Sequence, residues 1–109
     1  MATIIDFPTA DFSVGDIVHH KLFDYRGVVV DVDSKCQATD EWYEHVARSR
    51  PPRDKPWYHV LVDGSDHSTY VAQQNLEPDG LMTAIHHPLV EEVFAGLENG
   101  RYIRKDRIN

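Results

Sequence analysis

The chain has 109 residues and a formal net charge of −7, with 41% hydrophobic and 27% charged residues. This composition indicates one globular domain and excludes a disordered chain. No apolar run approaches the roughly 18 residues that span a bilayer, and a single cysteine, Cys36, excludes an internal disulfide and a multi-cysteine metal site. Residues 1–12 lack the basic start of a signal peptide, so a soluble, cytoplasmic protein without membrane contact is expected.

The order of the expected strands and helices along the sequence predicts a single domain, residues 1–109, built around a small β-barrel. An N-terminal arm, about 1–11, precedes the barrel, about 12–80. An insertion, 34–56, interrupts the barrel, and a C-terminal helix with a basic tail, about 87–109, follows it. The fold class is therefore mainly β, with about five strands, one inserted helix and one short C-terminal helix.

Short valine-rich segments with a period of two predict the strands, and residues 27–33 are the clearest of them. Further strands are expected at 14–20, 57–63 and 67–72, with a short turn or closing strand at 75–78. Closure into a barrel would remove the exposed edges of such a small sheet. The predicted core consists of Val28, Val30, Val32, Val60, Val62 and Tyr70. The opposite face of the clearest strand carries Val29, Asp31 and Asp33, and solvation explains the two carboxylates.

Two helices are predicted outside the strands. In the insertion, Thr39 is a suitable N-cap, and Pro51 stops the helix by Arg50. The second helix begins at Pro88 and ends at 99–100, an Asn-Gly pair. Its apolar stripe is expected to dock on the barrel or on a second subunit. Because a small barrel has limited area to cover the stripe, we expect a homo-oligomer. The stripe consists of Leu89, Val90, Val93, Phe94 and Leu97.

Little in the sequence predicts catalysis. The adjacent His19 and His20 point to opposite faces of a strand and cannot bind one ion. His59 and His67 flank one hairpin, but a zinc site would need further ligands. The chain has no Gly-rich phosphate loop, no G-x-S-x-G and no H-E-x-x-H motif. We therefore expect no enzyme, no catalytic residue, no cofactor and no metal.

The aromatic and cationic residues favour binding of a partner over catalysis. Trp57 lies on the strand face opposite Tyr58 and is the candidate for an exposed anchor that grips a partner. Two segments each place four cations beside a single acid, and they are either solvated faces or contact sites. The tail cations are candidates for a protein partner: Arg101, Arg104, Lys105 and Arg107. The insertion cations are candidates for DNA: Arg48, Arg50, Arg53 and Lys55.

Three segments carry a family pattern, in this order: Val14–Asp33 (VGDIVHHKLFDYRGVVVDVD), Pro56–Val62 (PWYHVLV) and Ser68–Leu76 (STYVAQQNL). They resemble the HspQ family of bacterial heat-shock proteins, also called the YccV-like or hemimethylated-DNA-binding family. The resemblance implies an SH3-like barrel that self-associates. It also implies two activities, which are binding of hemimethylated DNA near the replication origin and enhancement of degradation by the Lon protease. A related domain in a chloroplast adaptor of the Clp protease favours the second activity.

Charge distinguishes the two implied activities. A DNA-binding face needs a basic stripe, whereas the barrel segments carry only Lys21 and Arg26 among several carboxylates. The acidic balance favours protein partners. We therefore expect an adaptor that acts on Lon and its substrates through protein contacts, with hemimethylated DNA as the alternative partner.

Overall fold

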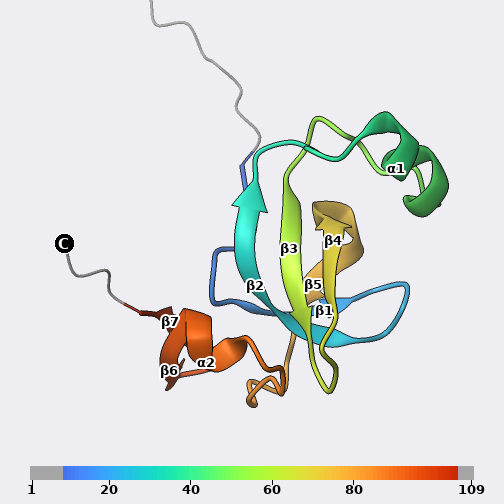
Figure 1. Ribbon diagram of the computed structural model, residues 1–109. Coiled ribbons are helices and arrows are strands. Elements are labelled where there is room, and N and C mark those ends of the chain that lie inside the picture. Colours follow the sequence, from blue (N-terminus) through green and yellow to red (C-terminus); the bar gives the residue numbers. More distant parts are fainter. Residues whose placement is uncertain (1–8, 106–109) are drawn as a thin grey trace, which may run out of the picture.

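The computed structural model describes residues 9–105, and most of them form or connect β-strands (Figure 1). A five-stranded antiparallel sheet has the order β4-β3-β2-β1-β5. Its strands are β1 (Ile17–His20), β2 (Arg26–Asp33), β3 (Trp57–Val62), β4 (Ser68–Ala72) and β5 (Leu76–Pro78). A 3-10 helix, η1 (Gln73–Asn75), leads from β4 directly into β5. The mainly β class and the five strands of the predicted barrel are confirmed.

Closure of the sheet into a barrel is not confirmed by backbone pairing. Among the described strands, β4 pairs with β3 alone and β5 pairs with β1 alone, so these two strands form the edges. The short η1 connection bends the chain back from one edge strand to the other. The sheet is therefore curled, with one edge of β4 left without a strand partner.

Strand β2 is buried on both faces, which corrects the predicted one-sided core. Val28 and Val29 are each 0% exposed, although they point to opposite faces. A β-bulge at Val30 breaks the alternation: Val30 remains on the side of Val28, and Val32 changes to the side of Val29. Of the predicted core residues, Val28 and Val60 are buried, whereas the other four are only partly buried, namely Val30, Val32, Val62 and Tyr70.

Each face of β2 belongs to a separate core. The inner core consists of Phe12, Val18, Val29, Tyr58, Val60, Val71 and Leu76. The outer core consists of Ile17, Val28, Leu61, Ile85, Val90, Phe94 and Tyr102. The outer core draws on the last quarter of the chain, so the C-terminal segment is a layer of the fold rather than an appendage.

The predicted C-terminal helix is wrong over most of its length. Helix α2 covers only Val90–Val93, and the chain then forms a hairpin of β6 (Phe94–Glu98) and β7 (Arg101–Arg104). Asn99 and Gly100 have positive φ angles of 52° and 76°. Two positive φ angles are the requirement of a tight two-residue hairpin turn, which Asn-Gly meets at low cost. The predicted basic tail is therefore in part a strand.

The apolar stripe was expected to dock on the barrel or on a second subunit, and the structure shows it packed on the chain's own sheet. Val90 and Phe94 are buried in the outer core, and Val93 and Leu97 pack against it. Leu89 remains 42% exposed. Four of the five stripe residues are thus engaged within the chain, and they do not offer a free interface for a second copy.

The insertion forms α1 (Asp40–Val46), shorter than predicted. The predicted cap is confirmed, because the Thr39 hydroxyl oxygen accepts a hydrogen bond from the Trp42 N–H (3.1 Å). A third cluster joins this helix to the sheet: Cys36, Ala47, Trp57 and Ala72 are buried, with Trp42 and Tyr43 packed on them. No helix within residues 9–105 is long and apolar enough to cross a membrane.

The bulge makes a testable distinction between neighbouring valines. Val29→Ala should lower the free energy of unfolding by about 1–3 kcal/mol, because it opens a cavity in the inner core. Val30→Ala should cost clearly less, because Val30 is only partly buried. Urea denaturation of both variants measures the difference. An equal or larger loss for Val30→Ala would contradict the bulge.

Candidate functional site: an apolar groove along β4

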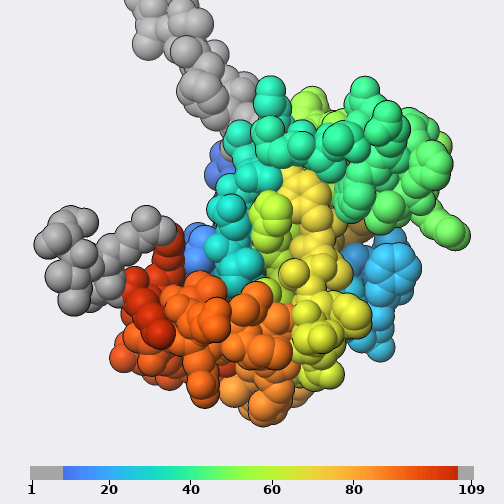
Figure 2. Space-filling view, viewed as in Figure 1, coloured from blue at the N-terminus to red at the C-terminus, as the bar shows by residue number. Residues whose placement is uncertain are grey.

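An apolar groove of about 710 Å³ runs along β4. The β1–β2 loop forms one wall and the α1 insertion forms the other. In Figure 2 both walls lie to the right of the yellow β4, with the insertion (green) above the loop (light blue). The chain has 18 carboxylate side chains, yet none of those within residues 9–105 lines this groove. The lining residues are His20, Leu22, Phe23, Tyr25, Trp42, Val46, Ala47, Arg48, Ser49, Pro51, Trp57, His59, Ser68, Thr69, Tyr70, Val71, Ala72 and Asn75.

The β1–β2 loop presents two apolar side chains to solvent. Leu22 is 58% exposed and Phe23 is 73% exposed. The buried His20 holds this loop, because its Nδ1 accepts hydrogen bonds from the backbone N–H groups of Leu22 (3.1 Å) and Phe23 (3.0 Å). The Phe23 ring stacks on the imidazole at 4.7 Å. The backbone of the loop and the Phe23 ring are therefore held in place by specific contacts, and the loop presents two apolar side chains that suit contact with a partner.

Adjacent histidines in β1 have opposite electrostatic environments. Burial, followed by repulsion from His19, lowers the pKa of His20 below its ordinary value of 6.5. This keeps the lone pair on Nδ1 that the loop requires. His19 contacts Asp24 (2.6 Å) and Glu77 (2.7 Å), and these hydrogen bonds raise its pKa. The predicted opposite orientation of the two side chains is confirmed by these different partners.

Trp57, the predicted exposed anchor, is buried at 1% exposure, and that prediction is wrong. The α1 insertion folds back over it, with the Trp42 ring at 6.0 Å and the Tyr43 ring at 6.3 Å. The indole N–H donates to the carbonyl of Pro52 (3.0 Å), which satisfies its polar atom inside the protein. Trp57 thus supports the α1 wall of the groove from below, and exposed Val46 forms the rim of that wall.

Tyr70 fixes the floor of the groove. Its hydroxyl donates to Asp33 Oδ2 (2.6 Å) and accepts the Gln37 N–H (3.0 Å). Burial, and then the hydrogen bond to Asp33, raises the pKa of Tyr70 above its ordinary value. The hydroxyl therefore remains a neutral donor, and the ring stays oriented between Trp57 and His59.

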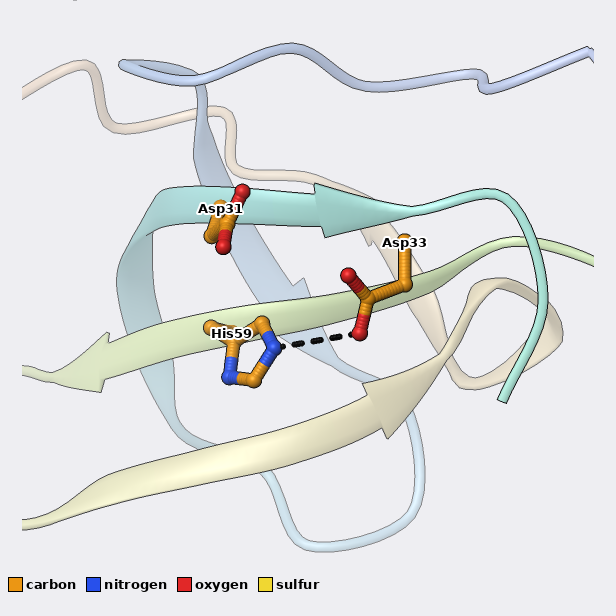
Figure 3. A group of neighbouring side chains, drawn as sticks. All are labelled: Asp31, Asp33 and His59. Carbon is orange, nitrogen blue, oxygen red and sulfur yellow. Dashed lines mark hydrogen bonds and ion pairs between the residues drawn. The ribbon is translucent and has the colours of Figure 1, made fainter. Parts of the chain in front are cut away.

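One cluster among residues 9–105 has the geometry to hold a metal ion: the ligand atoms of Asp31, Asp33 and His59 lie within 4.8 Å of one another (Figure 3). Asp31 is exposed as expected, but Asp33 is half-buried, so the solvated carboxylate pair is wrong for Asp33. His59 Nε2 lies 3.3 Å from Asp33, which also accepts the Tyr70 hydroxyl. These contacts account for the cluster as a hydrogen-bond network that supports the groove floor.

The insertion cations are largely engaged within the chain. Arg53 pairs with Asp40 (2.7 Å) and lies over the Tyr43 ring at 4.8 Å. Arg50 pairs with Glu44. Arg48 and Lys55 are exposed, and within the described residues they make no ion pair. Arg48 lines the groove and is its one cationic side chain among residues 9–105, apart from histidines.

Some of the cations predicted in the basic tail lie in a strand. Arg101 is in β7 and pairs with Asp16 (3.3 Å). Arg104 ends β7 and Lys105 follows it, both exposed, whereas Arg107 lies outside the described residues. Figure 1 places β7 and α1 at opposite ends of the molecule, so the two basic segments do not form one stripe.

The sheet and the groove together define a small antiparallel β domain with an apolar surface beside one edge strand. The chain belongs to the YccV-like family. Residues 10–101 match the family model described as "Hemimethylated DNA-binding protein YccV like", which confirms the resemblance seen in the sequence.

The two histidines of β1 should titrate on opposite sides of pH 6.5. His20, with a lowered pKa, stabilises the fold above pH 6.5, and this contribution is lost as the pH falls below that value. His19, with a raised pKa, contributes below pH 6.5, and its contribution is lost as the pH rises through the folded-state pKa. NMR titration of the ring protons measures both values. A His20 pKa above that of His19 would refute the assigned loop contacts.

Proposed function

We propose that this chain is a non-enzymatic adaptor in the cytoplasm that presents protein substrates to the ATP-dependent Lon protease. The observation that carries the proposal is the groove: on a protein of net charge −7, an apolar surface to which the described part of the chain contributes no carboxylate. Its volume of about 710 Å³ lies in the range of natural binding pockets. An unfolded or partly unfolded substrate exposes the apolar side chains that such a surface buries.

Electrostatics disfavour nucleic acid at this surface. A DNA-binding face requires free cations arranged along one side. In the described chain Arg50, Arg53 and Arg101 are ion-paired. Arg26 is likewise paired, with Asp63 and Asp79. These four arginines are thus engaged with carboxylates of the same chain, which makes them less available for phosphate contacts.

Hemimethylated DNA remains the second candidate, because the family description names it. The exposed cations Arg48, Lys55, Arg104 and Lys105 would then supply phosphate contacts from two separate ends of the molecule. Such binding would be weak and strongly salt-dependent. Self-association also remains a proposal, and two residues of the predicted stripe, Val90 and Phe94, are already buried within the chain.

A degradation assay tests the adaptor. The wild-type protein should accelerate Lon turnover of an unfolded model substrate, and Phe23→Ser should remove most of the acceleration. Phe23 is 73% exposed, so its replacement should leave the melting temperature nearly unchanged. Leu81→Ser is the matched control, because Leu81 is 67% exposed and lies outside the groove.

A duplex titration in parallel decides between the two candidates. Hemimethylated and fully methylated duplexes are compared at about 0.15 M salt. If Lon turnover is indifferent to the protein while hemimethylated duplex is bound selectively, the adaptor proposal is wrong and the DNA alternative replaces it.

A further inference from the structure

The groove includes the free edge of β4 as well as the part of one sheet face that carries Trp57 and His59 of β3. Successive residues of a strand point to opposite faces, yet all five residues of β4 line the groove. Residues from both faces of β4 line one groove because the groove extends to the edge of the strand. The edge that lines the groove is the one that has no strand partner in the described chain.

Hydrogen-bond alternation identifies which backbone groups face the groove. The Val62 N–H donates to the His67 carbonyl (3.0 Å), which sets the phase of the β3–β4 ladder. Thr69 and Val71 consequently direct their backbone groups toward β3. Ser68 and Tyr70 direct theirs outward, and within residues 9–105 these groups have no backbone partner.

The side chains around this edge add two further preferences. Leu22, Phe23 and Val46 are apolar and more than half exposed along the two walls. Arg48, exposed and free of ion pairs in the described chain, is the one guanidinium or ammonium group that lines the groove. Apolar walls favour apolar side chains, and the arginine favours a carboxylate at one end of the bound segment.

We propose that an extended, unfolded polypeptide segment binds here by adding a strand to β4. The segment carries apolar side chains at alternate positions and an acidic residue near one end. Its backbone pairs with Ser68 and Tyr70, and its alternate side chains enter the space between Phe23 and Val46. This rests on the proposed adaptor function and names the substrate chemistry that the groove recognises. Strand addition is suited to unfolded chains, because the backbone supplies affinity and the pockets supply selectivity.

A defined peptide tests binding without the protease. The probe is a fluorescently labelled peptide of about nine residues, with Val and Phe alternating with Thr and a Glu at one end. Fluorescence anisotropy should show saturable binding at about 0.15 M salt. A peptide with Ser in place of Val and Phe should bind at least about tenfold more weakly, a change of about 1.4 kcal/mol.

Protein variants place the peptide in the groove. Phe23→Ser and Arg48→Glu should each weaken binding at least about fivefold, whereas Leu81→Ser should not. Arg48→Glu should lose its effect when the Glu of the peptide is replaced by Lys, because the charge pair is then restored. Binding that is unaffected by both groove variants overturns the proposal.

Backbone methylation of the peptide tests strand addition itself. Methyl groups on alternate amide nitrogens block the pairing edge in one series and point away from β4 in the other. One series should abolish binding while the other retains it. Equal effects of the two series would show that the β4 edge is not used and would overturn the proposal.

The outcomes separate this inference from the adaptor function. Absence of peptide binding with intact Lon stimulation overturns the inference alone. Methylation-sensitive peptide binding without Lon stimulation supports the inference and refutes the adaptor function. Light scattering that shows a wild-type dimer and a Phe23→Ser monomer would assign the groove to a second copy, which also overturns the inference.

Discussion

The rest of the structure depends on the burial of β2 on both faces. Val28 and Val29 point in opposite directions and both are fully buried. One face is covered by the curl of the sheet itself, but the other has to be covered by something outside the sheet. The C-terminal hairpin and α2 supply that cover. Because this C-terminal layer covers the outer core, it does not pair with β4, and no other strand within residues 9–105 pairs with the free edge of β4.

The groove is a consequence of the unpaired edge of β4. Curling brings β5 back to β1 through η1 but leaves β4 open. The insertion then builds one wall on Trp57, and the β1–β2 loop builds the other on His20. Both walls rest on buried residues, while Leu22, Phe23 and Val46 at the rim are more than half exposed. A rigid frame with an apolar rim suits the proposed binding of an extended chain, because such binding would need no large rearrangement.

Sequence patterns predicted the strands, the Thr39 cap and the mainly β class, because these depend on neighbours in the chain. The failures arose where a distant segment changes the environment. Trp57 was expected in solvent because alternation does not reveal that α1 folds over it. The 89–97 stripe fits a helical period, which led to the predicted helix. The Asn99-Gly100 pair, however, strongly favours a two-residue hairpin turn, and this is the structure that the segment adopts. The groove itself was not predicted. Its one readable sign was the apolar pair Leu22 and Phe23 in a polar loop.

The contact between Gly15 and β7 has a mechanical consequence. The Tyr102 N–H donates to the Gly15 carbonyl (2.9 Å), and a Cβ on Gly15 would lie 2.1 Å from the Tyr102 carbonyl oxygen. The C-terminal strand is thereby fastened to a segment near the other end of the described chain. A force applied at the C-terminus would have to break this contact and the β6–β7 ladder together before it reached the sheet. An enzyme that unfolds proteins by pulling on the C-terminus would therefore have to break these hydrogen bonds first.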